Sequence, residues 1–237
     1  MKLNHLRRYL LIMIIFTNII IAQEDLSVFT ELSKIEFRDN VKSEKIVLNY
    51  NPTNSEVINK QVKDEHFEIR GYITRLVITK IDSLSSDKYL IDYDPGISAD
   101  PMFCITKIFP DTIKYYPCID GLIISIPGNG YIYISGHTDN MFDQKKIYKI
   151  EDNKLVEVQQ PYYYVGMETE TNIRMDLFSD RSMRNKVVSL EKGAKITVLI
   201  NTDNYYLIAT QFGIVGWFDY RTHYRDNPIK GIYFAGD

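Results

Sequence analysis

The segment "YYLIATQFGIVGWFDY", from Tyr205 to Tyr220, contains the only tryptophan of the chain, placed after an alternating apolar run. Neighbouring side chains of a strand point to opposite faces, so we expect one of Tyr205 and Tyr206 to be buried and the other exposed. Gly216 allows the backbone to bend, and Trp217 adds apolar area to a small core. We therefore predict that Trp217 is a core residue, with a ligand contact as the alternative.

The residues before this segment predict two more short strands and their turns. "KITVLI", residues 195–200, is rich in β-branched residues, and "YYLIAT", residues 205–210, is its expected partner. Lys192-Gly193 provides a turn before the first strand, and "NTDN" provides one between the two. The C-terminal part of the chain is thus predicted to be a small β structure.

From Thr171 onward the chain resembles the bacterial SH3-like domain, a small β-barrel attached to many exported cell-wall proteins. The matching pieces stand in the family's order: "NIR" at 172–174, "KVVSLEKGAKITVL" at 186–199, "YYLIAT" at 205–210 and "GIVGWF" at 213–218. The resemblance implies an SH3-like barrel over residues 162–224, with residues 225–237 as a C-terminal tail or a closing strand.

The same resemblance implies a ligand groove on this domain. Its candidate residues in this chain are Asn172, Arg174, Tyr205, Tyr206 and Trp217. Two loops that shape the family's groove depart from its pattern, because "MDLFSD" at 175–180 replaces Gly-Pro and "DYRTHY" at 219–224 lacks the closing Tyr-Leu. Tyr205 also replaces a usual tryptophan. The fold therefore transfers to this chain better than the ligand does.

A second resemblance concerns residues 128–150 and 159–166. They are similar to exported proteins of Bacteroidota that carry the same terminal domain and have no assigned activity.

The first residues have the pattern of a secretory signal peptide. A basic flank with Lys2, Arg7 and Arg8 precedes an apolar run that ends near Ala22. A membrane anchor is the alternative, but the run is short for a bilayer, which needs about 20 apolar residues, and polar residues interrupt it. We predict cleavage after residue 22 and an exported protein, periplasmic or secreted, without a membrane span in its mature form.

The charge of the mature chain narrows the possible binding partners. Loss of residues 1–22 removes three basic and no acidic residues, so the formal net charge falls from −3 to −6. Such a surface repels phosphate backbones, so nucleic acid is not an expected partner.

Cys104 and Cys118 are an even pair of cysteines in an oxidising compartment, which makes them disulfide candidates. Two separate buried thiols are the alternative.

Residues 23–161 are predicted to form a separate β-rich domain of unknown function. "LIISIPGNGYIYIS" at 122–135 and "KKIYKIEDNKLVEVQ" at 145–159 both have the pattern of β-hairpins. "FEIRGYITRLVITKI" at 67–81 predicts a long bent strand or a hairpin, and "KYLIDYD" at 88–94 its partner. We expect helices only near 24–34 and 55–67, so the fold class is all-β.

No catalytic, metal-binding or cofactor-binding pattern stands out. Cys104 and Cys118 lie in strand-like or turn-like sequence rather than at a helix start, which argues against a cysteine nucleophile. His137, with Ser135 and Asp139 nearby, is better explained as a hydrogen-bonded loop histidine, because other histidines have no ligand-like spacing.

The sequence therefore favours a non-enzymatic binding protein of the cell envelope. Its SH3-like domain is expected to engage peptidoglycan peptide, glycan or an envelope protein. The alternatives are a cell-wall or glycan hydrolase with His137 and Asp139 in an N-terminal active site, and a structural subunit without a small ligand.

Overall fold

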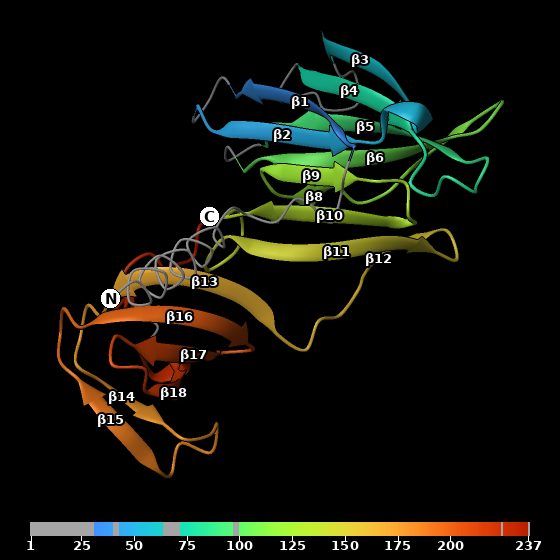
Figure 1. Ribbon diagram of the computed structural model, residues 1–237. Helices are drawn as coiled ribbons and strands as arrows, with labels where there is room; N and C mark the ends of the chain where they lie inside the picture. Colours follow the sequence, from blue (N-terminus) through green and yellow to red (C-terminus); the bar gives the residue numbers. More distant parts are fainter. Residues whose placement is uncertain (1–30, 40–42, 64–71, 97–99, 224, 237) are drawn as a thin grey trace, which may run out of the picture. The chain divides into compact units, whose positions relative to one another are not determined.

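Alternating β-branched, aromatic and polar residues produce strands along most of the chain (Figure 1). The computed structural model describes residues 31–39, 43–63, 72–96, 100–223 and 225–236. These residues contain strands and short 3-10 turns but no α-helix, which confirms the predicted mainly β class. Within them, no helix is long and apolar enough to cross a membrane. The predicted signal peptide, residues 1–22, lies outside the described residues.

The chain divides into two compact units, Met1–Leu32 and Ser33–Asp237. Only residues 31 and 32 of the first unit are described. The second unit holds three sheets and two hydrophobic cores. The boundaries proposed from the sequence at residues 22, 161 and 224 stay predictions.

The first sheet of this unit has six strands. Its order is β1 (Ser33–Arg38), β2 (Lys45–Tyr50), β9 (Ile123–Ile126), β10 (Tyr131–Gly136), β11 (Gln144–Glu151) and β12 (Lys154–Glu157). All neighbouring pairs are antiparallel except β2 and β9, which run parallel. A parallel pair needs a long crossover, and here the crossover is the whole second sheet.

The second sheet forms between β2 and β9 along the chain. Its order is β3 (Ser55–Val62), β4 (Ile73–Thr79), β5 (Lys88–Asp94), β6 (Met102–Ile108) and β7 (Ile113–Tyr115), with β8 (Ile119–Asp120) also paired to β6. The predicted strand at 88–94 is confirmed as β5. Of the strand or hairpin predicted at 67–81, residues 73–79 form β4, and residues 67–71 lie outside the described residues.

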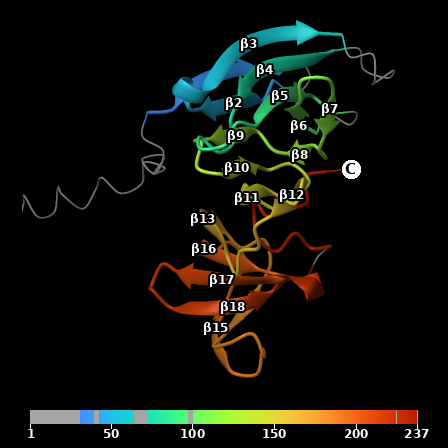
Figure 2. The same cartoon turned by 90° about the vertical axis from the view of Figure 1, so that its right-hand side faces the viewer.

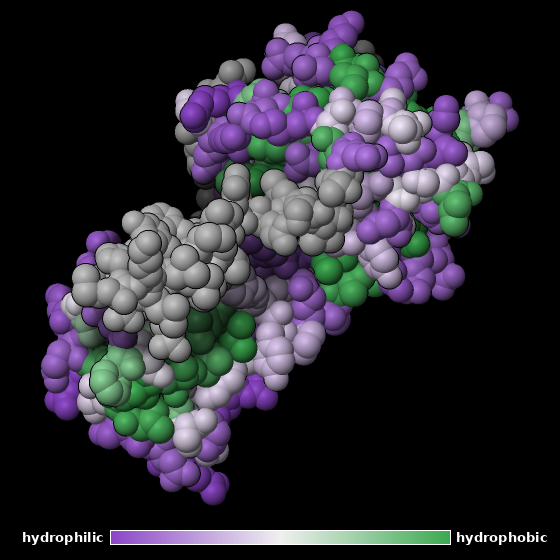
Figure 3. Space-filling view, in the orientation of Figure 1, coloured by the Kyte–Doolittle hydropathy of each residue, from purple (hydrophilic) through white to green (hydrophobic). Residues whose placement is uncertain are grey.

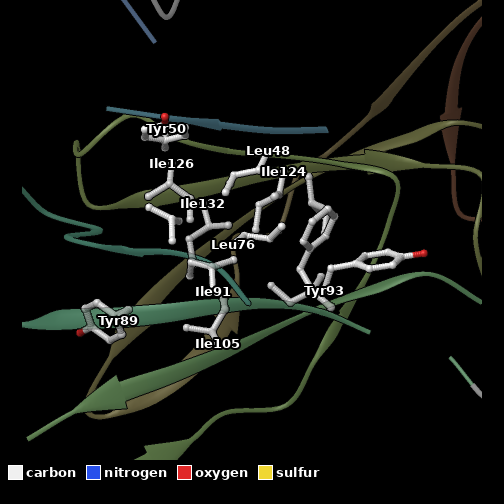
Figure 4. Close-up of a cluster of buried hydrophobic side chains, with 14 of the residues drawn as sticks. Leu48, Tyr50, Leu76, Tyr89, Ile91, Tyr93, Ile105, Ile124, Ile126 and Ile132 are labelled. Carbon is white, nitrogen blue, oxygen red and sulfur yellow. The ribbon is translucent and has the colours of Figure 1, made fainter. Parts of the chain in front are cut away.

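The two sheets share one hydrophobic core. Side chains from β2, β9 and β10, including Leu48, Ile124 and Ile132, meet Leu76 of β4 and Ile91 of β5 (Figure 4). These five side chains are inaccessible to solvent. The sheets therefore pack face to face as a sandwich, and the strands that supply this core bury apolar side chains.

Both predicted hairpins of this sandwich are confirmed. β9 and β10 pair antiparallel across the Pro127–Gly130 turn, where Gly128 and Gly130 have positive φ. β11 and β12 pair across Asp152 and Asn153, which both adopt left-handed backbone with φ of 49° and 58°. Asp and Asn tolerate this conformation better than most residues, so the turn follows from its composition.

The helix predicted at 55–67 is wrong for residues 55–62, and residues 64–67 lie outside the described residues. Residues 55–62 form the edge strand β3, which pairs with β4 from Ser55 opposite Thr79 to Val62 opposite Ile73 and contains a bulge near Asn59. The tertiary partner decides here, because strand formation depends on pairing more than on local pattern. Of the helix predicted at 24–34, residues 24–30 lie outside the described residues, while Ser33 and Lys34 begin strand β1.

Cys104 and Cys118 form a disulfide in this structure. Cys104 lies on β6, and Cys118 lies between β7 and β8, the two short strands that both pair with β6. The bond closes a loop with a sequence separation of 14 residues. Closing a loop of this size lowers the conformational entropy of the unfolded chain, which raises the free energy of unfolding by about 3 kcal/mol.

The third sheet is formed by the C-terminal part of the chain, and we call it the C-terminal sheet. Its order is β13 (Tyr163–Glu170), β16 (Lys195–Thr202), β17 (Tyr205–Thr210), β18 (Val215–Asp219), β14 (Met175–Phe178) and β15 (Lys186–Leu190). Figure 2 shows β16, β17 and β18 side by side. The strands predicted at 195–200 and 205–210 are thus confirmed, while the predicted barrel closure stays an expectation.

The last described residues pack against the C-terminal sheet. Ile229 and Ile232 are fully buried in its core, and Thr171 pairs with Ile229 in an isolated bridge. A second isolated bridge joins Asn140, in the β10–β11 loop, to Ala235. Residues 228–236 therefore hold the β10–β11 loop and the C-terminal sheet together.

Candidate functional site

Tyrosines 205 and 206 face opposite sides of β17, as the alternation predicts. Tyr206 is only 2% exposed and packs edge-to-face against Tyr220, with ring centroids 5.6 Å apart. Tyr205 is half-buried on the outer face. Tyr206 was a candidate groove residue, and the structure corrects this assignment, because a side chain enclosed in the core presents no surface to a ligand.

Trp217 does not lie in the core, contrary to the expectation from the sequence. Gly216 and Phe218 on either side of it are buried, so Trp217 points outward and is half-buried. Gly216 instead allows a close approach: a Cβ there would lie 2.8 Å from the Cβ of Leu177 on β14. The core aromatic residue of β18 is therefore Phe218.

Trp217 belongs to a row of apolar side chains that crosses five strands on the outer face. The cross-strand pairs that define it are Tyr164 with Ile200, Ile200 with Leu207, Leu207 with Trp217, and Trp217 with Phe178. Directly paired residues point to the same face, so these five side chains form one continuous surface, the Trp217 row. All five are half-buried or exposed. Hydrophobic surface is visible over β16 to β18 in Figure 3.

Two arginines flank this row beside Tyr205. The guanidinium carbon of Arg181, in the β14–β15 loop, lies 5.9 Å from the ring centres of both Tyr205 and Trp217. The guanidinium carbon of Arg221 lies 5.0 Å from the ring centre of Tyr205. These distances are typical of cation–π contacts. The Trp217 row, Tyr205 and the two arginines form the candidate site.

Arg221 is fixed in this site by Asp219. Its Nε donates to both carboxylate oxygens of Asp219 at 3.0 and 3.2 Å, and its Nη2 donates to Asp219 at 2.6 Å and to the Tyr205 hydroxyl at 2.5 Å. These hydrogen bonds lower the pKa of Asp219 and raise that of Arg221. Asp219 thus stays ionised and holds the Arg221–Tyr205 pair in one geometry.

Arg174, another candidate from the sequence, lies at a neighbouring pocket. This open pocket of about 440 Å³ has Met175, Phe178 and Phe218 among its apolar lining residues, and His223 also contributes to it. The Arg174 Nε lies 3.5 Å from Glu191 in an exposed ion pair. Phe178 belongs both to the pocket and to the Trp217 row, so the two surfaces adjoin.

Asn172, a groove candidate from the sequence, contacts the C-terminal residues. Its side-chain amide donates to the Asn227 carbonyl at 2.7 Å, and its backbone N–H donates to the Pro228 carbonyl at 2.8 Å. It therefore fastens the C-terminal residues beside β13.

His137 and Asp139, the two residues considered for a hydrolase site, both contact the C-terminal segment. His137 Nε2 lies 3.0 Å from the Tyr233 carbonyl, and the two rings lie 4.8 Å apart. The Asp139 backbone N–H donates to the Ala235 carbonyl. Both residues thus hold the C-terminal segment, and the disulfide leaves neither cysteine as a free thiol. Among the described residues, no three His, Cys, Asp or Glu side chains cluster so as to hold a metal ion.

The chain matches no protein-family model, no curated protein and no solved structure.

Sequence reasoning named Tyr205 and Trp217 as groove candidates but did not include the groups around them. Leu207 and Phe178 follow from strand register, which becomes known only when the strands are paired. Asp219 and Arg221 could have been found from the sequence. Asp219 lies two residues after Trp217 in β18, so the two side chains point to the same face, and Arg221 follows two residues later. Arg181 has no sequence signal, because it lies in a loop distant from both rings along the chain.

Proposed function

We propose that this protein is a non-enzymatic binding protein of the bacterial cell envelope, and that it holds peptidoglycan on the outer face of its C-terminal sheet. The Trp217 row with its flanking arginines is the observation that carries the proposal. The signal-peptide pattern and the resemblance to exported SH3-like domains support the location. On this basis the C-terminal sheet is the SH3-like domain expected from the sequence.

The physical character of the row suits an extended ligand made of sugar and peptide. Tyrosine and tryptophan combine a large apolar face with a polar tip, and they lose little conformational entropy on binding. Trp217 and Tyr205 lie on paired strands, so their backbone positions are fixed in the absence of a ligand. Preorganised aromatic residues of this kind contribute most of the binding energy at many interfaces.

Charge supports an anionic polymer as the ligand. The mature chain is expected to be acidic, yet Arg181 and Arg221 stand next to the row. Peptidoglycan carries free carboxylates on its peptides. Arg181, beside the aromatic rings, offers such a polymer a local cation on a protein whose net charge is negative.

The direct test is co-sedimentation with purified peptidoglycan sacculi. The full chain is expressed, and the form that the cell processes and exports is purified as wild type, as Trp217→Ala and as Tyr131→Ala. Tyr131 is a matched control, because it is an aromatic residue 40% exposed on the sandwich. We expect Trp217→Ala to weaken binding about tenfold or more, the usual effect of removing a central aromatic contact, and Tyr131→Ala to bind like wild type.

Each other outcome contradicts part of the proposal. If wild type does not sediment with sacculi, peptidoglycan is not the ligand, and an envelope protein becomes the expected partner. Equal loss in both variants would move the site away from the Trp217 row. Release of soluble muropeptides during the incubation would show a hydrolase and contradict the non-enzymatic assignment. Urea unfolding of each variant shows whether a binding loss reflects a loss of fold.

A further inference from the structure

The two arginines of the candidate site differ in how far their hydrogen-bond donors are used. Arg221 directs its Nε and Nη2 donors at Asp219 and Tyr205, with distances from 2.5 to 3.2 Å. Within the described residues, the only polar contact of Arg181 is its Nη1 at 3.9 Å from the Asp203 carboxylate. That distance is too long for a hydrogen bond. Arg221 is therefore a structural cation, and Arg181 keeps its donors available.

The loop that carries Arg181 is locally ordered by its own hydrogen bonds. Its ends are joined where the Ser179 backbone N–H donates to the Asn185 carbonyl at 2.9 Å. Inside it, the Asp180 carboxylate accepts the Ser182 backbone N–H at 2.8 Å, and the Met183 backbone N–H donates to the Asp180 carbonyl at 3.2 Å. Arg181 is therefore presented from a defined turn rather than from an open chain.

The position of Arg181 determines what it can bind. Its guanidinium is equally distant from the rings of Tyr205 and Trp217, and its side chain is 48% exposed. A guanidinium beside aromatic rings leaves the N–H donors at its edge free, and their fork geometry matches a carboxylate. A ligand carboxylate bound there would place the adjoining part of the ligand against Trp217 and Tyr205.

We propose that Arg181 recognises a carboxylate of the bound polymer and that this contact sets the specificity of the site. The inference rests on the proposed function, because it names the ligand group that the same surface selects. The carboxylate displaces the long contact between Arg181 and Asp203. We assign no direct part to Arg221, since the Asp219 carboxylate already balances its charge and accepts from its Nε and Nη2.

The test compares two forms of one ligand. Native sacculi are used beside sacculi whose carboxylates have been converted to neutral amides with a carbodiimide and an amine. The proteins are wild type, Arg181→Gln, Arg181→Lys and Arg184→Gln. Arg184 is a matched control, because it is an exposed arginine of the same loop, and its substitution makes the same change in net charge without removing a cation from the aromatic rings.

We expect wild type to bind amidated sacculi about tenfold more weakly than native sacculi, because a charge-assisted hydrogen-bond pair is lost. Arg181→Gln should bind both forms equally and at the weaker level. Arg181→Lys should keep part of the preference for native over amidated sacculi, because lysine keeps the charge but lacks the paired N–H donors of a guanidinium. Arg184→Gln should behave like wild type.

Three results would overturn the inference. If wild type binds native and amidated sacculi equally, no carboxylate is recognised, although the proposed function stands. If Arg181→Gln and Arg184→Gln lose binding to the same extent, attraction is a general charge effect. If wild type binds neither form, the proposed function fails and the inference fails with it.

Discussion

At the scale of single residues, adjacent aromatic side chains of one strand have different tasks. Tyr206 closes the core beneath the sheet, where Phe142 and Tyr220 pack against it. Burial raises the pKa of Tyr206 above the ordinary tyrosine value. Tyr205 lies outside and carries the two arginine contacts. One step along a strand thus separates a residue needed for folding from a residue available for binding.

The variants Tyr206→Ala and Tyr205→Ala should separate these tasks. Removing the enclosed ring of Tyr206 leaves a cavity, so we expect the free energy of unfolding to fall by about 3–5 kcal/mol. Tyr205→Ala should lower it by less than about 1 kcal/mol, because the ring is partly in solvent already. Urea unfolding followed by fluorescence measures both. Similar losses in the two variants would show that the assigned faces are wrong.

At the scale of elements, the C-terminal segment behaves as part of the sheet core. Ile229 and Ile232 are fully buried, the Tyr220 hydroxyl donates to the Ile232 carbonyl at 3.1 Å, and Lys230 and Lys195 both bind Glu170. Although the sequence after residue 224 is short and rich in turn formers, its two isoleucines complete a core that the six strands leave open.

Substitutions in this segment should follow burial rather than residue size. Ile232→Ala removes a fully buried side chain, so we expect a loss of about 2–5 kcal/mol in the free energy of unfolding. Phe234→Ala is the control: the side chain is larger, but it is 45% exposed, and its loss should have a small effect. Thermal unfolding of the two variants tests this order, and a greater loss for Phe234→Ala would contradict the packing described.

At the scale of the whole molecule, ionised carboxylates link stability to pH. Hydrogen bonds from lysines, an arginine, serines and the backbone lower the pKa of five carboxylates: Glu36, Glu170, Asp176, Asp180 and Asp219. The unfolded chain then binds more protons than the folded one at moderately acid pH. This stabilisation is therefore complete at pH values above the unfolded pKa of these carboxylates, about 4, and is lost as the pH falls through their folded pKa values. Asp120, whose pKa burial raises, acts in the opposite direction.

We therefore expect the urea midpoint of wild type to fall as the pH drops from about 5 to about 2. Glu170→Gln should reduce the pH-dependent part of this loss, because Lys195 and Lys230 then have no carboxylate between them. Glu168 lies on the same strand and makes no ion pair among the described residues, so the urea midpoint of Glu168→Gln should change with pH as that of wild type does. Midpoints that do not change with pH in wild type would rule out the linkage.

The sequence alone was enough for the mainly β class, both hairpins of the sandwich and the strands at residues 195–200 and 205–210. These features depend on local alternation and turn residues such as Asp152 and Asn153, which act within a few positions of one another. It also predicted that Tyr205 and Tyr206 point apart, but not which of them is buried.

The tertiary structure decided the features that need a distant partner. The segment 55–62 is a strand because β4 pairs with it, and Cys104 meets Cys118 because β7 and β8 both pair with β6. Trp217 lies outside because Gly216 and Phe218 face the core that β14 and the C-terminal segment complete. Register and loop placement bring Arg181 to Tyr205 and Trp217. No local pattern encodes either, since both depend on the pairing of strands that lie apart along the chain.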